Sequence, residues 1–151
     1  MVKRIDTTVK RIGTTARKRQ TQAGTSVVEA TIVFPLMLLL VFGIGEFGIA
    51  FTQWNSLTNA VREGARTGVV FRSPCDSVAV TSLVKTTVEN FASSSGIDPV
   101  NITTTVSPTC QPTGTSLTVT ATLPFNYIAL DALAGLAPST NLTARSVMRS
   151  E

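Results

Sequence analysis

The sequence predicts an α+β membrane protein. A long N-terminal transmembrane helix continues into a stalk, and a small exterior domain with a helix and a three-stranded antiparallel sheet follows. Three observations lead to this fold class: an almost uninterrupted apolar stretch at residues 30–51, a basic segment before it, and segments with helical and alternating apolar spacing after it. We therefore divide the chain into a basic leader (1–24), a helix and stalk (25–71) and a small exported domain (72–151).

The apolar stretch is long enough to cross a membrane. At about 1.5 Å per helical residue, residues 30–51 extend over roughly 33 Å, and a bilayer's hydrocarbon core is about 30 Å thick. Pro35 lacks an amide donor and crowds the carbonyl of Thr31, so we expect the helix to bend there. Trp54 follows the stretch among polar residues and is the natural marker of the outer membrane interface. The lipid bilayer is therefore a predicted partner.

The distribution of charge predicts the orientation. Residues 1–23 contain seven basic side chains and one acidic side chain, whereas the rest of the chain contains six basic and eight acidic ones. Short flanks rich in Lys and Arg stay in the cytoplasm, so we expect a cytoplasmic N-terminus and an exported C-terminal domain. No aromatic interleaving or nucleic-acid-binding motif accompanies the basic leader, which argues against binding to nucleic acid.

The junction between leader and span differs from a secretory signal peptide. In such a signal, cleavage follows an apolar region of about 7 to 15 residues, whereas here Gly24 precedes a longer one. The order of basic leader, Gly24, four residues, Glu29 and apolar helix is similar to the leader of type IV pilin-like proteins. This resemblance implies that a prepilin peptidase cuts between Gly24 and Thr25, and that Glu29 meets the terminal amine of a neighbouring subunit. A simpler interpretation places Glu29 at the lipid headgroup boundary.

Two further motifs resemble the TadE-like family, the pseudopilins of tight-adherence (Flp) pilus systems. The first is Gly43-Ile44-Gly45-Glu46-Phe47-Gly48, and the second is the Asn-Ala-x-Arg-Glu-Gly-Ala-Arg stretch that ends at Arg66. In that family both motifs follow a Val-Glu pair and an apolar run containing Pro, in this order. Within the second motif, we single out Asn59, Arg62, Glu63, Gly64 and Arg66 as candidate functional residues.

The resemblance implies a function in a bacterial cytoplasmic membrane. The chain would be a minor pseudopilin of a type IVc pilus assembly or secretion system, acting in pilus biogenesis, adhesion and surface attachment. Its partners would be a prepilin peptidase, other pilins or pseudopilins and the assembly platform. Ala30 follows Glu29 where major Flp pilins tend to have Tyr, which argues against a major filament subunit. The alternative function is an uncleaved single-span anchor whose exterior domain binds a partner.

Glu46 is the least expected residue of the apolar stretch. It precedes Trp54 by eight residues, or about 12 Å along a helix. A charge at the bilayer centre costs about 2.5 to 3.5 kcal/mol, so we expect its carboxyl group to be protonated, paired or turned toward another helix. Glycines flank it and would let another backbone approach closely, which indicates contact with a partner helix. They are Gly43, Gly45 and Gly48. Alternatively, local thinning of the bilayer lets the side chain reach water.

In the part of the chain expected to be exported, the sequence pattern predicts a helix and three strands. On the stalk, Leu57, Ala60, Val61 and Ala65 have helical spacing and form a candidate packing stripe. Asp76 is a candidate N-cap for a helix that ends in Ser93-Ser94-Ser95-Gly96, with an apolar face at Val80, Leu83, Val84, Val88 and Phe91. Alternation then predicts strands with inward residues Val100, Ile102 and Val106; Leu117, Val119, Ala121 and Leu123; and Leu142, Ala144, Ser146 and Met148.

Residues 126–137 lie between the second and third strands and are too few for a second span. They are apolar apart from Asn126, Tyr127 and Asp131. One interpretation is a helix that covers a face of the sheet. The other is a helix that lies on the membrane surface or docks to a partner.

Cys75 and Cys110 are the only cysteines, and both are predicted on the exported, oxidising side. We expect them to form a disulfide, and closing a loop of about 36 residues is worth roughly 3 to 4 kcal/mol in the chain-entropy model. The chain has no His, no Gly-x-Ser-x-Gly motif and no phosphate-binding glycine loop with Lys. The sequence therefore predicts no enzyme, no catalytic residues, no metal site and no cofactor.

Overall fold

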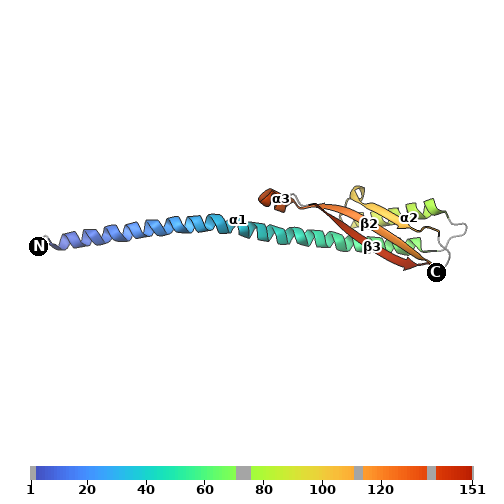
Figure 1. The fold of residues 1–151 in the computed structure, drawn as a ribbon, viewed down its shortest axis with the longest axis horizontal. Coiled ribbons are helices and arrows are strands. Elements are labelled where there is room, and N and C mark those ends of the chain that lie inside the picture. Colours follow the sequence, from blue (N-terminus) through green and yellow to red (C-terminus); the bar gives the residue numbers. More distant parts are fainter. Residues whose placement is uncertain (1–2, 71–75, 111–113, 136–138, 151) are drawn as a thin grey trace. The chain divides into compact units, whose positions relative to one another are not determined.

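The computed structural model of the chain describes residues 3–70, 76–110, 114–135 and 139–150 (Figure 1). Two compact units make up the chain, Met1–Phe42 and Gly43–Glu151. The α+β fold class is confirmed, because a long apolar helix is followed by a small domain with a helix and a three-stranded antiparallel sheet.

Helix α1 spans Lys3–Gly68 and supplies residues to both units. It therefore includes leader residues as well as the apolar stretch and most of the stalk. Pro35 lies inside the helix. The first unit contains the basic leader and most of the apolar stretch. Within residues 24–42, most large apolar side chains are exposed, with Phe34 60% exposed and Met37 63% exposed. A surface of this kind needs lipid or another helix around it.

Helix α2 spans Ser77–Ser94 in the second unit. Asp76 is its N-cap, as predicted, because its carboxylate accepts hydrogen bonds from the amides of Val78 and Ala79 at 2.9 Å and 3.3 Å. The helix ends in a Schellman motif: Gly96 has a positive φ of 80°, and the amide of Ile97 donates to the carbonyl of Ala92.

The face that α2 buries is narrower than the sequence predicted. It consists of Val80, Val84, Val88 and Ala92. Leu83 and Phe91 were expected on the same face, but they are 40% and 38% exposed. They flank the buried i, i+4 row, and a single row is enough to contact a sheet and one other helix.

The sheet has the order β1-β2-β3, and both pairings are antiparallel. Strand β1 is Thr103–Ser107, β2 is Ser116–Asn126 and β3 is Ser139–Arg149. The predicted inward residues of β2 are all buried, and Ala144 and Ser146 of β3 are buried on the same face. Val100 was expected in the first strand, but it lies in the 3-10 turn η1 (Pro99–Asn101) and is 88% exposed. The Asp98 side chain caps that turn and delays the strand.

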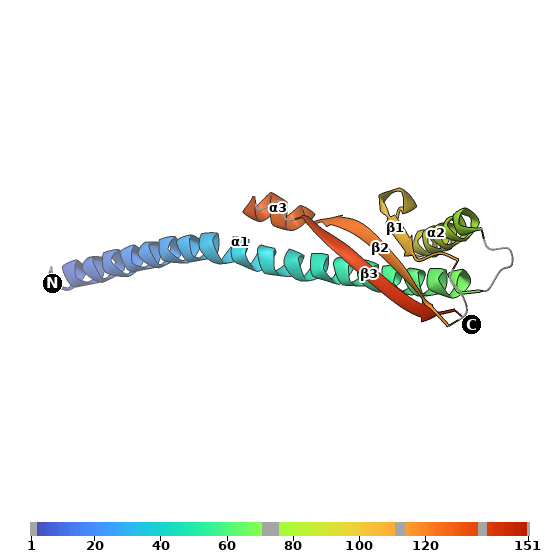
Figure 2. The same ribbon diagram turned by 45° about the vertical axis from the view of Figure 1, so that its right-hand side comes forward.

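The core of the second unit joins α1 to the small domain (Figure 2). Its largest side chains without exposed surface are Leu57 and Val61 of α1, Val84 and Val88 of α2, and Val119 of β2. The predicted stripe of Leu57, Ala60, Val61 and Ala65 is completely buried, so its packing role is confirmed. The stalk is therefore part of the folded domain and contributes four of its fifteen core residues among those that the structure describes.

Two glycines of α1 lie where α1 meets the rest of the core. A Cβ atom on Gly64 would lie 2.6 Å from Cγ2 of Val88, and one on Gly68 would lie 2.6 Å from Cδ2 of Leu117 and 2.8 Å from Cγ2 of Val84. These distances are far below van der Waals contact. The pair of glycines is thus explained by packing within one chain.

Helix α3 spans Ile128–Ala134 and connects β2 to β3. It lies beyond the ends of these strands and covers neither face of the sheet (Figures 1 and 2). The interpretation of this segment as a helix that covers the sheet is therefore wrong. The last paired residues of the two strands are Asn126 and Ser139, so the chain has already left the sheet when α3 begins.

We predict that Gly64→Ala destabilises the second unit. The added methyl group collides with the β-branched, fully buried Val88, and overpacking of this kind costs about 1 to 3 kcal/mol. The helix propensity gained on replacing Gly by Ala, about 1 kcal/mol, offsets only part of that cost. Denaturant unfolding of the detergent-solubilised protein measures the difference. Gly48→Ala is the matched control, because its Cβ would meet nothing within 4 Å; equal destabilisation of both variants would contradict the packing argument.

Candidate functional site

The predicted processing site lies on α1 in the first unit. Gly24, Thr25 and Glu29 are all exposed and helical. Thr25 and Glu29 are four residues apart, so they lie on the same helix face one turn apart.

Glu46 is held by its own chain. Its Oε1 atom accepts a hydrogen bond of 2.6 Å from the backbone amide of Ala129, at the start of α3. That amide belongs to the first turn of a helix, where backbone donors have no intrahelical acceptor. The carboxyl group and the amide therefore satisfy one another within the second unit.

Trp54 makes a second hydrogen bond between α1 and a backbone group of the small domain. Its indole nitrogen donates a hydrogen bond of 3.1 Å to the backbone carbonyl of Thr143 in β3, while the side chain remains 41% exposed. Trp has an apolar ring and one polar donor, which suits a membrane interface. In this protein the donor is used to fasten α1 to the edge strand β3.

The glycines around Glu46 are divided between two faces of α1. Gly43 and Glu46 are half-buried and Ala50 is buried, and their i, i+3, i+7 spacing puts them on one face. Gly45 and Gly48 are exposed and lie away from it. A Cβ on any of the three glycines would meet nothing within 4 Å. The predicted cluster is thus separated into a domain-facing side with Glu46 and an open side with Gly45 and Gly48.

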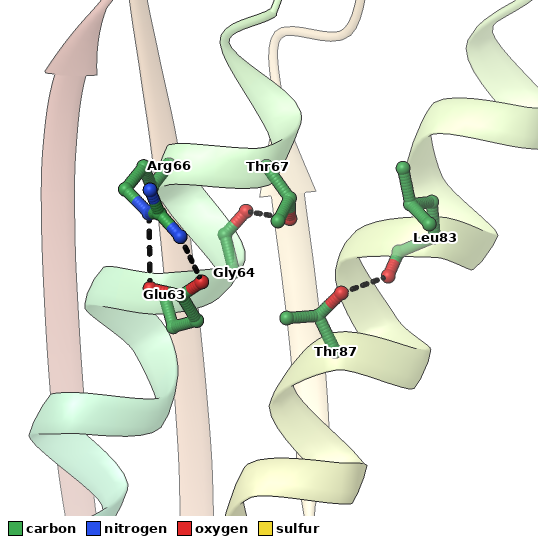
Figure 3. A network of polar contacts seen from close by, with 6 residues as sticks. All are labelled: Glu63, Gly64, Arg66, Thr67, Leu83 and Thr87. Atoms are coloured by element: carbon green, nitrogen blue, oxygen red, sulfur yellow. Dashed lines mark hydrogen bonds and ion pairs between the residues drawn. The ribbon is translucent and has the colours of Figure 1, made fainter.

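The second motif combines a packing face and a charged face. Ala60, Val61, Gly64 and Ala65 are buried, whereas Asn59, Arg62 and Arg66 are exposed. Figure 3 shows that Glu63 and Arg66 lie together on the outer side of α1. The guanidinium binds the carboxylate through two hydrogen bonds, Nη2 to Oε1 at 2.7 Å and Nε to Oε2 at 3.1 Å. Most of the motif is therefore explained by folding: small residues admit α2, and an ion pair one turn apart supports the helix.

This ion pair shifts both ionisation equilibria. The hydrogen bonds from Arg66 lower the pKa of Glu63 below its ordinary value of 4.5, and the Glu63 carboxylate raises the pKa of Arg66. The pair is exposed to solvent, with 72% of the Arg66 side chain accessible, so water and salt weaken its effect on stability.

Cys110 follows β1 and has a positive φ of 60°. Its predicted partner, Cys75, lies outside the described residues, so the disulfide stays a prediction. Within residues 24–70, 76–110, 114–135 and 139–150, no three His, Cys, Asp or Glu side chains gather as metal ligands would.

The comparison with known families decides what the segment around these residues is. The sequence model of the TadE-like proteins matches residues 24–66. This part of the chain is TadE-like. No curated protein and no solved structure matches the chain.

The TadE-like match confirms the family resemblance seen in the sequence and covers Gly24, Glu29, Glu46 and the motif that ends at Arg66. It points to the tight-adherence pilus system. In the described residues, the same segment holds the one helix that is long and apolar enough to cross a membrane, so the chain is a membrane protein.

Sequence reasoning missed the partners of Glu46 and Trp54. Both partners are backbone groups of residues 129 and 143, and backbone groups leave no trace in the sequence. One signal was available: a carboxyl group in an apolar helix needs a donor, and one interpretation of the weakly charged segment 126–137 already placed it at the membrane surface.

We predict that the Glu63–Arg66 pair stabilises the protein at neutral pH and not in acid. Because the folded-state pKa of Glu63 is depressed, its contribution is complete above the unfolded value of 4.5 and disappears as the pH falls through the lower folded value. The unfolding midpoints of the wild type and Glu63→Gln should therefore differ at pH 7 and converge below pH 4.5. Glu89→Gln is the control, because its contact with Lys85 is longer, at 3.7 Å. A difference for Glu63→Gln that persists in strong acid would show that the ion pair is not its cause.

Proposed function

We propose that the chain is a minor pseudopilin of a tight-adherence (Flp, type IVc) pilus assembly or secretion system. It is processed by a prepilin peptidase and acts structurally in pilus biogenesis, adhesion and surface attachment. The observation that supports this most is the TadE-like match, which begins at Gly24 and continues through the apolar part of α1. The basic leader favours a cytoplasmic N-terminus, an exported C-terminal domain and a location in the bacterial cytoplasmic membrane.

The environment of Gly24 suits a peptidase substrate. A protease needs an extended strand of substrate, so a helical cleavage site has to unwind locally before it is cut. Gly lowers helix stability by about 1 kcal/mol relative to Ala, which makes unwinding at Gly24 easier than elsewhere in this region. Its exposure leaves the site open to an enzyme. Cleavage there removes the leader and leaves the apolar stretch in the mature protein.

Glu29 is placed to act in assembly after cleavage. The new amine would be on Thr25, one turn from Glu29 on the same face, and the carboxylate complements the positive end of the shortened helix. In a crowded membrane the amine of one subunit can also pair with Glu29 of its neighbour. The exposure of Glu29 leaves it accessible to such a partner.

The open side of α1 suits contact with other pilins, pseudopilins or the assembly platform. Gly45 and Gly48 are exposed and leave room for another helix backbone. Phe47, which is 67% exposed, lies beside them in the sequence and offers apolar surface to that helix. We assign partner contact to this side, because Glu46 on the other side already binds Ala129.

The N-terminus of the mature protein tests this proposal. Expressed with a prepilin peptidase, the wild type should begin at Thr25, as measured by mass spectrometry of the membrane-extracted protein. Gly24→Ala should keep the leader. Gly45→Ala, a glycine of the same helix outside the processing site, should be processed like the wild type.

An intact leader on the wild type in peptidase-competent cells would contradict the pseudopilin proposal. That result would favour the alternative, an uncleaved single-span anchor that carries a small exterior binding domain. Normal processing of Gly24→Ala would remove the assignment of the cleavage site.

A further inference from the structure

The tip of the small domain lies beside the apolar part of α1. Two hydrogen bonds within the second unit show this: Ala129 donates to Glu46, and Trp54 donates to Thr143. Glu46 lies five residues inside the end of the apolar stretch at Phe51, or about 7.5 Å along the helix. The start of α3 is therefore at the level of the membrane-spanning residues.

Distances along the two elements agree with this placement. From Trp54 to Glu46, α1 advances about 12 Å. From Thr143 back to Ser139, where β3 begins, the strand advances about 13 Å. The part of β3 between Thr143, beside Trp54, and Ser139 thus has the length needed to reach the level of Glu46, where α3 begins. Figures 1 and 2 also show α3 at the end of the β2–β3 pair where β3 begins.

The surface at this tip is apolar and aromatic. Ile128 is 79% exposed, although it begins a helix in a folded domain. Phe125 and Tyr127 precede it and form an edge-to-face pair with ring centroids 5.0 Å apart. Asp131 is the only ionisable group apart from the Tyr127 phenol between residues 124 and 138. Tyr beside aliphatic residues is the composition found where proteins meet the headgroup and acyl regions of a bilayer.

We propose that α3 is a membrane-inserting helix that enters the leaflet at the Phe51 end of the span. Interfacial helices bury their apolar face about 5 to 10 Å into the headgroup–acyl boundary, and the level of Glu46 falls within that range. The occupant of the α3 surface is lipid, because this surface continues the exposed apolar surface of α1 at the same level, where Phe47 and Ile49 are 67% and 56% exposed. The protein then contacts the membrane through two helices, α1 and α3.

Glu46 has a positioning role in this arrangement. Its bond to the Ala129 amide fixes the start of α3 at one level of α1, and in turn the amide satisfies a carboxyl group inside the apolar stretch. Insertion of α3 depends on the membrane span alone and not on cleavage of the leader. Its failure is therefore distinguishable from failure of the pseudopilin proposal.

Photo-crosslinking of the full-length chain tests the proposal. The photoreactive residue p-benzoylphenylalanine is placed at position 128 or, as a matched control, at Val100, an apolar position of the same domain that is at least as exposed. The protein is reconstituted in vesicles of phosphatidylethanolamine and phosphatidylglycerol, irradiated and analysed by mass spectrometry. We expect lipid adducts at position 128 and none at position 100.

Three results would overturn the proposal. Equal lipid labelling at positions 128 and 100 would show that the labelling is unspecific. Absence of lipid adducts at position 128 would show that α3 faces water. Crosslinks from position 128 to a second copy of the chain in place of lipid would show that α3 is a protein interface. Glu46→Gln retains an oxygen acceptor and should keep the lipid adducts, whereas Glu46→Ala should reduce them; unchanged labelling in Glu46→Ala would refute the positioning role of Glu46.

Discussion

The close packing of α1 against α2 and β2 is the interaction on which the rest of the structure depends. A domain of this size has a thin core, and residues 57–65 of α1 supply Leu57, Val61 and two alanines to it. Because Gly64 and Gly68 have no side chain, the side chains of Val84, Val88 and Leu117 can pack closer to the backbone of α1 than a Cβ atom would allow. Without this stretch of α1, the apolar faces of α2 and the sheet would be open to water.

This packing joins residues 43–68 of α1 and the small domain into one compact unit. The apolar residues 43–51 and the core residues 57–65 belong to the same helix. The bonds of Glu46 and Trp54 extend this connection to the tip of the β2–β3 pair.

Much of this fold could be predicted from the sequence, because strong periodicity and caps define each element. The alternation in β2, the N-cap at Asp76 and the stripe from Leu57 to Ala65 were all confirmed. Prediction was weaker where a side chain could satisfy either of two patterns. Val100 fits a strand pattern, but the turn that Asp98 caps takes precedence over it.

The candidate site was only partly predictable. Its motif residues were identified by type and spacing, and the odd position of Glu46 was recognised. The contact that satisfies Glu46 could not be derived, because its donor is a backbone amide 83 positions away in the chain. The division of the glycines between two faces of α1 likewise depends on where the domain packs, which is a tertiary property.

Hydrogen exchange of the full-length protein in vesicles tests the central claim most directly. If α1 completes the core, the amides of Val61 and Ala65 should be protected to the same degree as those of Val84 and Val119, because all four become accessible only in global unfolding. Rapid exchange along residues 57–65, with the amides of α2 and β2 still protected, would show that the domain folds without the helix and would contradict the account.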